Sequence, residues 1–399
     1  MSLQYNFSDK TKKATFAMMG IGILAIIYAF VAGIEGQRIW ANLLVNIFFF
    51  LSIGLGATFY MAKKYAAEAS YAIVYKRVYE AISGYVPVGS VLLILFLLLG
   101  YFHFHHIYHW MDTEVYNPQS EHYDKIIANK APYFSAPFFW GRILIFFGLY
   151  NYCRHLLRKR SLEEDLTGDF SLYRKNITTS AAFLVLFGFT SPVLVWDTIM
   201  SIDTHWFSTM FGWYVFAGFW CTTMITITLF SLHLKGKGHL DEMNDNHFHD
   251  LGKWIFALSF LWTYTFFCQF MLIWYANIPE EVTYFQDRLG DFGYRPLFWI
   301  MFFLNFSLPM VILMSRDAKR NPAFLKTMGV ILLFTHWLDI FVVVMPGSVA
   351  GHWGIGFLEI GLFIGFAGLF VFVVLNQLAK APLLAQKHPF FEESKHHHI

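Results

Sequence analysis

The sequence predicts an all-α protein that crosses a membrane many times, and three observations carry that prediction. Of its 399 residues, 57% are hydrophobic and 14% are charged, whereas soluble proteins hold about 45–50% apolar and about 25% charged residues. The apolar residues are gathered into ten long runs, and Lys and Arg are concentrated in alternate loops between those runs. This composition excludes a soluble globular protein.

Each of the ten runs is close to the length that a membrane-spanning helix needs, which is about 20 apolar residues. They cover approximately residues 14–34, 40–60, 84–105, 135–156, 176–200, 207–232, 253–275, 295–314, 324–346 and 353–376. No polar linker between the runs is long enough to separate a soluble domain. We therefore expect residues 1–399 to form a single membrane domain with loops.

The distribution of positive charge predicts the orientation of the chain. Of the 29 Lys and Arg residues, 23 lie in the two tails and in alternate loops, five lie in the opposite loops, and Arg142 lies inside the fourth predicted span. Because loops rich in Lys and Arg stay on the cytoplasmic side, both termini are expected to be cytoplasmic. The formal net charge is only +2, which argues against a nucleic-acid-binding protein.

Two pairs of similar segments lie four spans apart. APFFWGRILIFFGLY (136–150) resembles RPLFWIMFFLNFSLP (295–309), and FT followed by HW occurs in 189–206 and again in 334–353. Copies four spans apart have the same orientation in the membrane, which predicts two four-helix units of parallel repeat with one extra helix at each end. The predicted parts are a first helix with the N-terminal tail (1–39), the two units (40–206 and 207–352), a last helix (353–380) and a cytoplasmic tail (381–399). Chance similarity among aromatic-rich helices is the alternative.

Ionisable side chains inside predicted spans are candidates for function, because each costs about 2.5–3.5 kcal/mol on insertion scales. His336 and Asp339 are three residues apart in the ninth span, so they share one helix face. Glu359 lies in the next span at nearly the same depth as Asp339, roughly 10 Å below the outer boundary. Two carboxylates in one apolar site favour protonation of one of them. We expect the three side chains to form the outer half of a proton path, and a hydrogen-bonded structural trio is the alternative.

A second candidate set lies near the outer ends of the first spans. It comprises Arg142 about 10 Å inside the fourth span, Asp197 at the end of the fifth, Asp203 and His205 in the turn that follows, and His103 and His105 at the end of the third. An acid, several bases and a cation are what proton release from a quinol hydroxyl requires. The alternative is that Arg142 and Asp197 pair only to neutralise each other.

The cysteines and histidines predict no metal or haem centre in this chain. Cys153, Cys221 and Cys268 lie in apolar runs and form no C-x-x-C pair. Haem ligation by two histidines needs two facing imidazoles, yet His336 is the one histidine near the middle of a predicted span. Residues 396–398 are histidines in a tail that we expect to be mobile.

Two stretches are more specific than generic membrane sequence. They are SIDTHWFSTMFGWYVFAG (201–218) and FCQFMLIWYANIPEEVTYF (267–285). They resemble the signature segments of the NrfD/polysulfide-reductase membrane-anchor family, and most closely the ActF-type anchors of bacterial alternative complex III. The likeness covers essentially the whole chain.

The resemblance implies a subunit of a quinol:cytochrome c oxidoreductase in the bacterial cytoplasmic membrane. Such complexes pass electrons from menaquinol to cytochromes c or directly to a terminal oxidase, and the anchors hold no redox centre of their own. The implied partners are a related anchor, a periplasmic iron–sulfur subunit and multihaem cytochrome c subunits, which carry the iron–sulfur and haem c centres, together with lipid. Outer loops 106–134 and 276–294 are then expected to face the iron–sulfur subunit.

The resemblance does not assign menaquinol to this chain, because the better-supported quinol pocket belongs to the other anchor of such complexes. Proton conduction and scaffolding therefore stay open as roles. A secondary transporter is a further alternative, since transporters also combine repeats with ionisable groups near the membrane midplane. Against that alternative, no predicted span is broken by paired Gly and Pro near its middle.

Overall fold

The computed structural model describes residues 4–398, and helices make up most of this part of the chain. The long helices are α1 (Asp9–Val31), α2 (Gly36–Ala66), α4 (Val86–Tyr101), α7 (Ala136–Thr167), α8 (Phe170–Thr198), α9 (Thr209–Gly236), α10 (Asp245–Ala276), α12 (Arg295–Ile312), α14 (Pro322–Val349) and α15 (Phe357–Leu378). The short ones are α3 (Lys76–Ser83), α5 (Lys125–Asn129), α6 (Ala131–Phe134), α11 (Pro279–Gln286), α13 (Arg316–Arg320) and α16 (Phe391–Lys395). The predicted all-α fold is confirmed.

Among the described residues, nine helical segments are long and apolar enough to cross a membrane, with α3 and α4 counted together as one. The chain is therefore a multi-pass helical membrane protein, as its composition predicts. The predicted span 135–156 is the exception. It lies in α7, which has 32 residues but not the apolar composition of the other nine, because polar side chains such as Arg142, Asn151 and Arg154 interrupt it.

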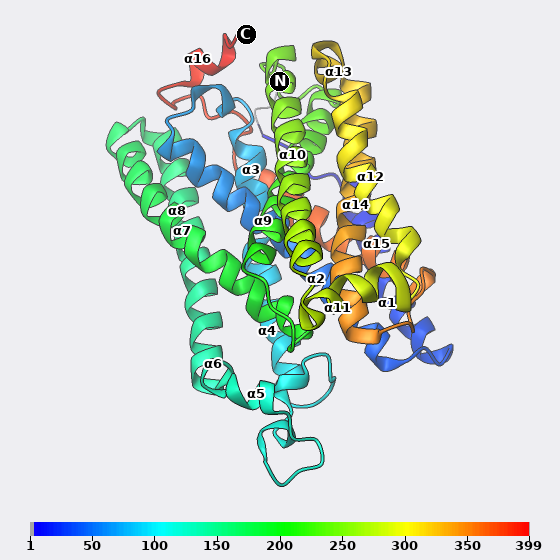
Figure 1. Cartoon of the computed structure of the whole chain (residues 1–399). Helices are drawn as coiled ribbons and strands as arrows, with labels where there is room; N and C mark the ends of the chain where they lie inside the picture. Colours follow the sequence, from blue (N-terminus) through cyan, green and yellow to red (C-terminus); the bar gives the residue numbers. More distant parts are fainter. Residues whose placement is uncertain (1–3, 399) are drawn as a thin grey trace.

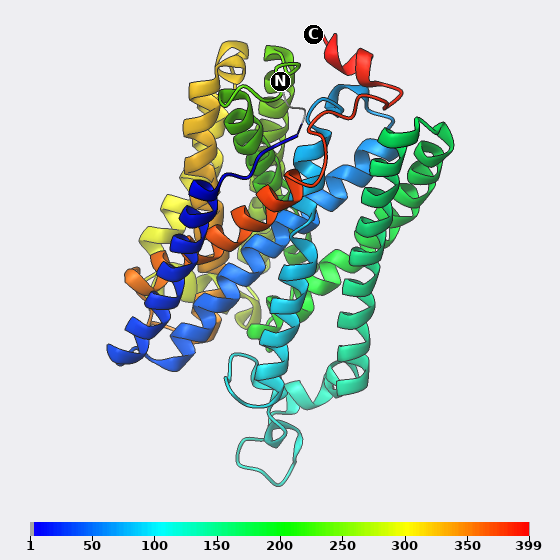
Figure 2. The ribbon, with the colours of Figure 1, turned by 180° about the vertical axis from the view of Figure 1, so that it is seen from behind.

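Both termini lie at one end of the helical bundle (Figure 1). We call that end the terminal face. The opposite end, which we call the loop face, carries α5, α6 and the long connection between α4 and α7 (Figure 1). Seen from behind, α1 and α15 lie side by side although they come from opposite ends of the chain (Figure 2).

The long helices form two closed rings of contacts. In the first ring α2 contacts α4 and α8, and α7 contacts the same two helices. In the second ring α9 contacts α10 and α14, and α12 contacts the same two helices. The helices of each ring belong to one of the two predicted four-helix units, and contacts of α9 with α2 and α8 join the rings. The repeat relationship between the units stays a prediction.

Small residues let the first and last helices approach closely. A methyl group added at Gly22 of α1 would lie 2.8 Å from the Cα atom of Gly365 on α15, and one at Gly361 would lie 2.5 Å from the Cβ atom of Ala25. Membrane helices use small residues in this way to bring their backbones together. The pair is attached to the rest of the molecule by contacts of α15 with α2 and α3.

A buried charge network ties α3 to α7 near the terminal face. The carboxylate of Glu80 accepts hydrogen bonds from Arg77 at 2.7 Å, from Ser161 at 2.5 Å and from Arg158. Arg77 also donates to Asp165 at 2.9 Å. From the sequence alone, Arg77 and Arg158 counted only as loop cations, because their shared partner lies 78 residues from Arg158 along the chain.

The C-terminal tail packs against the terminal face, which corrects the expectation of a mobile tail at 396–398. The His397 ring lies 2.8 Å from Asp250, and the side-chain amides of Asn244 and Asn246 donate to the His397 carbonyl at 2.9 and 3.3 Å. The beginning of α10 thus offers a carboxylate and two amides that satisfy the polar groups of the tail.

Candidate functional site

Asp339 of α14 is buried inside the second ring of helices, with 3% of its surface exposed. The hydroxyl of Tyr214 on α9 donates to Oδ1, and Nε1 of Trp262 on α10 donates to Oδ2 at 2.9 Å. Within residues 4–398, no Lys or Arg forms an ion pair with Asp339. Acidic side chains inside membrane helices are rare, and proton relays are among the functions that they mark.

A glycine on α9 makes room for this arrangement. A methyl group at Gly218 would lie 3.3 Å from the Trp262 ring and 3.6 Å from Oδ2 of Asp339. Gly218 lies one helical turn after Tyr214, so the two residues share the face of α9 that meets α10 and α14. The segment 201–218, singled out from the sequence, therefore supplies both a hydrogen-bond donor and the space beside it.

His336 lies on the same face of α14 as Asp339, as the three-residue spacing predicts. Its ring and the Trp262 ring are perpendicular to each other, with the ring centres 5.9 Å apart. In the described chain neither ring nitrogen of His336 has a hydrogen-bond partner. The structure thus places His336 and Asp339 against one tryptophan, without a hydrogen bond between them.

Glu359 has a different set of partners, so the structure does not join it to Asp339. Its carboxylate accepts hydrogen bonds from Arg38 at 2.9 Å, from Asn42 at 3.1 Å and from the backbone N–H of Gly356 at 2.8 Å. The physical reason is the position of α2, which contacts both α14 and α15. Glu359 is neutralised by a cation of α2, whereas Asp339 faces α9 and α10.

Asparagines of α2 connect the surroundings of Glu359 with α14. Asn42 donates to Glu359, and Asn46 of the next turn donates to the Asn42 carbonyl at 2.9 Å. Asn46 also accepts a hydrogen bond from the indole N–H of Trp337 at 3.1 Å. Trp337 lies between His336 and Asp339 in the sequence. Its hydrogen bond to Asn46 therefore attaches another face of the same stretch of α14 to α2.

The structure brings Arg142 and Asp197 together as a two-fold hydrogen-bonded ion pair. Arg142 donates to the two carboxylate oxygens at 2.9 and 3.0 Å, and Asp197 is fully buried. The guanidinium lies over the ring of Tyr133, 3.9 Å from its centre, and donates to the Tyr133 carbonyl. Two-pronged pairing of this kind is among the strongest protein hydrogen bonds, and it satisfies both charges.

Asp203 is paired with Arg288, a residue that the sequence analysis did not select. The guanidinium lies 3.5 Å from Oδ2 of Asp203. Arg288 is itself buried and donates to the carbonyls of Tyr284 and Val343, each at 2.8 Å. One signal in the sequence indicated the contact of Arg288 with Tyr284. The two residues are four apart, so in a helical turn their side chains lie on the same side.

The histidines of the predicted outer cluster lie apart from these ion pairs. His205 makes a 2.5 Å contact with Asp124 of the long loop. His103 is exposed, has a left-handed backbone with φ of 61°, and stacks on His106. His105 is buried and hydrogen-bonded to the Phe96 carbonyl at 3.1 Å. The predicted cluster is thus divided into separate pairs at the loop face.

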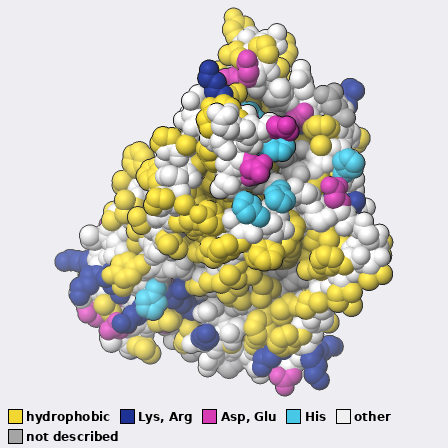
Figure 3. All heavy atoms as spheres, turned by 90° about the horizontal axis from the view of Figure 1, so that it is seen from below, with side chains coloured by type: hydrophobic (Ala, Val, Ile, Leu, Met, Phe, Trp, Pro, Cys, Tyr) yellow, Lys and Arg dark blue, Asp and Glu magenta, His cyan; other side chains and the backbone are white. Residues whose placement is uncertain are grey.

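Histidine and acidic side chains gather on the loop face among broad apolar areas (Figure 3). Exposed members of this set include His103, His106, His109, His122, His205, Glu114, Glu121 and Glu280. They come from the loop after α4, from the turn after α8 and from α11. The loop face therefore offers titratable groups but few cations.

Tyr284 of α11 lies near both Asp203 and Asp339. Its ring stacks on Trp206 at 4.2 Å, and the guanidinium of Arg288 lies 3.4 Å from its centre. Burial raises the pKa of Tyr284 to about 12; the Arg288 cation opposes the rise, and the Asp203 and Asp339 carboxylates add to it. Both carboxylates are therefore within electrostatic reach of one phenol. The segments 201–218 and 267–285 meet here.

No group of three or more His, Cys, Asp or Glu side chains in the described residues is placed to hold a metal ion. In comparisons with known proteins, no family model and no curated protein matches the chain.

Proposed function

We propose that this protein is a membrane subunit of a quinol-oxidising respiratory complex and that Asp339 carries protons toward the loop face. The observation that carries the proposal is the burial of Asp339 without a cation, between the donors Tyr214 and Trp262. The likeness of segments 201–218 and 267–285 to the NrfD-type anchors of alternative complex III supports it. Segment 201–218 supplies Tyr214 and Gly218 beside Asp339, and Tyr284 of segment 267–285 lies within electrostatic reach of that carboxylate.

The proposed topology has ten crossings, with both termini in the cytoplasm. The two termini lie at one face (Figure 1), which requires an even number of crossings, so we count α7 with the nine apolar segments. Most Lys and Arg residues lie in the tails and loops of the terminal face, and such loops stay cytoplasmic. The proposed membrane is the bacterial cytoplasmic membrane, and the loop face then points outward.

The proposed outer half of the proton path runs from Asp339 past two phenols to Asp203. Tyr214 is hydrogen-bonded to Asp339, and a hydroxyl is able to accept one proton while donating another. Tyr284 lies within electrostatic reach of both carboxylates. Asp203 is the exit acid, since its side chain is 25% exposed. Arg288 holds that carboxylate in place and supplies the neighbouring positive charge.

Menaquinol oxidation is assigned to the partners rather than to a pocket of this chain. The hollow near Arg142 and Asp197, lined by Tyr133 and Trp196 among others, holds about 210 Å³, less than the roughly 300–1,000 Å³ of ligand pockets. The Arg142–Asp197 pair is also complete without a ligand. In the proposed complex the loop face docks an iron–sulfur subunit, and multihaem cytochrome c subunits and a second anchor complete the assembly.

The first test asks whether the native protein has redox partners. Gentle detergent extraction followed by mass spectrometry of the co-purifying chains, with a reduced-minus-oxidised visible spectrum, is expected to show cytochrome and iron–sulfur subunits with c-type haem bands. A colourless protein without partners would contradict the respiratory proposal and favour a transporter, for which flux assays are the next step.

The second test addresses Asp339 within the assembled complex. We expect Asp339→Asn, reconstituted in liposomes with an enclosed pH indicator, to lower the number of protons moved per electron while the subunits stay together. Asp9→Asn is the matched control, because Asp9 is an exposed acid at the beginning of α1. Unchanged coupling in an assembled Asp339→Asn complex would refute the proton role.

A further inference from the structure

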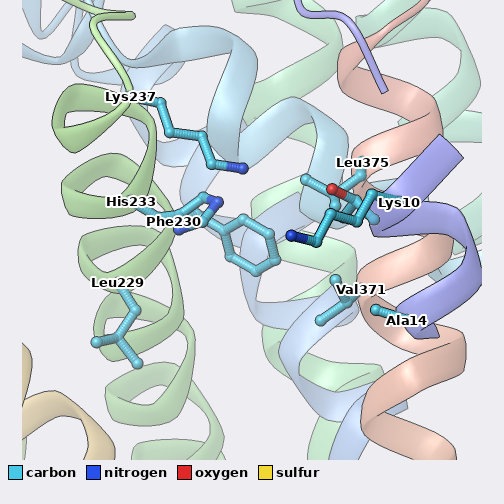
Figure 4. Close-up of a pocket in the computed structure, with 9 residues that line it drawn as sticks. Lys10, Ala14, Leu229, Phe230, His233, Lys237, Val371 and Leu375 are labelled. Atoms are coloured by element: carbon cyan, nitrogen blue, oxygen red, sulfur yellow. The ribbon is translucent and has the colours of Figure 1, made fainter. Parts of the chain in front are cut away.

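A hollow of about 560 Å³ lies between α1, α9 and α15 near the terminal face. Its volume is within the roughly 300–1,000 Å³ range of ligand pockets. Figure 4 shows Lys10 of α1 and Lys237 after α9 reaching toward each other across this hollow, with Phe230 and His233 between them. We call it the α1/α9 groove.

The upper part of the α1/α9 groove is strongly basic. Lys10, His233 and Lys237 line it, and a neighbouring hollow on the other side of α9 shares His233 and Lys237 and adds Lys326. Neither hollow has an acidic side chain among its lining residues. Within the described chain, Lys10, Lys237 and Lys326 form no ion pair or side-chain hydrogen bond. Three cations thus share one region without a counter-charge.

The lower part of the same groove is apolar. Leu229, Val371 and Ala14 lie below the lysines, and Phe230 and Leu375 lie at about the level of Lys10 (Figure 4). Lys10 lies at the beginning of α1 and Lys237 directly follows α9, so the change from basic to apolar coincides with the ends of two membrane helices. A molecule that complements both parts has an anionic head and a hydrocarbon tail.

We propose that the α1/α9 groove binds an anionic phospholipid of the leaflet at the terminal face. Its phosphate lies between Lys10 and Lys237, and one acyl chain follows Leu229 and Val371 toward the membrane centre. Basic pockets between helices on the cytoplasmic side are known to bind such headgroups. A quinone fits the charge less well, because its neutral ring leaves Lys10 and Lys237 uncompensated.

The binding test is a titration of the delipidated full-length protein with phosphatidylglycerol, followed by native mass spectrometry. One lysine near a membrane surface contributes about 1 kcal/mol to the attraction of anionic lipid. We therefore expect Lys10→Gln and Lys237→Gln each to weaken binding roughly 5-fold, and the double variant about 30-fold. The matched control is Lys13→Gln with Lys159→Gln, two exposed lysines that do not line the groove.

A second variant tests the apolar wall without changing any charge. Ala14 is exposed on α1 and lines the groove, so Ala14→Trp fills the space needed by the acyl chain and leaves the packed side of the helix intact. We expect it to weaken phosphatidylglycerol binding while Lys10 and Lys237 remain. Unchanged binding in Ala14→Trp would show that the lipid lies elsewhere.

Two ligand controls identify what the lysines recognise. Phosphatidylcholine, which has the same chains and no net charge, is expected to bind more weakly and to be insensitive to the lysine variants. Inorganic phosphate at equal concentration is expected not to compete. Competition by phosphate, equal binding of phosphatidylcholine, or an equal loss in the Lys13/Lys159 control would each overturn the proposal.

Discussion

The hydroxyl of Tyr214 on α9 donates a hydrogen bond to Oδ1 of Asp339 on α14, across the second ring of helices. Trp262 of α10 donates to the other oxygen at 2.9 Å, so each oxygen of the carboxylate has one donor from a different helix. Neither donor carries a charge, and both are buried. The carboxylate is thus oriented by hydrogen bonds without being neutralised.

Tyr214→Phe is expected to slow proton transfer and to leave the fold intact. The ring remains, and only the hydrogen bond is lost, which costs about 1–3 kcal/mol of stability when a buried group loses its partner. The measurement is proton release after single turnovers of the complex in liposomes, with thermal unfolding in parallel. Tyr152→Phe is the control, since Tyr152 is 63% exposed. Normal proton release by a destabilised Tyr214→Phe protein would reduce the hydrogen bond to a structural role.

Arg142→Gln is expected to be strongly destabilising, because it leaves Asp197 charged and fully buried. Breaking one partner of a buried ion pair costs about 3–5 kcal/mol. The double variant Arg142→Leu with Asp197→Leu is expected to be more stable than Arg142→Gln, since no lone charge remains. Thermal unfolding in detergent compares the two, and a double variant that is the less stable would show that the pair does more than neutralise itself.

Gly347→Ala is expected to displace Asp203 from Arg288. A methyl group at Gly347 would lie 2.2 Å from Oδ1 of Asp203, and overpacking of this kind costs about 1–3 kcal/mol. Gly141→Ala is the control, because a methyl group there meets nothing within 4 Å. Adding Asp203→Ala to Gly347→Ala is expected to recover part of the lost stability. Equal melting temperatures for Gly347→Ala and Gly141→Ala would contradict the predicted clash.

The docking of the C-terminal tail is expected to weaken as the pH falls. Burial lowers the pKa of His388 to about 2, and the cations of Lys76 and Arg77 lower it further against the opposing charge of Glu80. Its Nδ1 accepts a hydrogen bond from the Phe390 N–H at 3.2 Å, which a proton on that nitrogen would abolish.

The direction of this pH effect follows from the pKa of histidine in the unfolded tail, which is about 6.5. Below that pH the unfolded tail binds a proton before the folded tail does, so the stabilisation is complete above about pH 6.5 and declines progressively below it. Hydrogen exchange of residues 381–398 at pH 7.5 and 5.5 measures this loss. His388→Gln is expected to reduce the pH dependence and exposed His396→Gln to keep it; the reverse pattern would assign the effect to His396.

The helices and the local geometry of Asp339 were predictable from the sequence. Nine predicted spans correspond to apolar helical segments, because the length and hydropathy of a run depend on that run alone. His336 and Asp339 share a face of α14 for an equally local reason, the helical repeat. The Arg142–Asp197 pair was also predictable from the sequence, since an arginine and an acid at similar depth in consecutive helices have few other partners.

The partners of the remaining charges were decided by tertiary structure. Glu359 pairs with Arg38, 321 residues away, and Asp203 with Arg288, because α2 and the connection after α11 occupy positions that no local pattern records. The sequence by itself determined where the long apolar helices form and that ionisable groups such as Asp339 and Arg142 lie within them. Only the packing of helices distant in the chain decided which of those groups meet, because each helix has several faces and its neighbours choose among them.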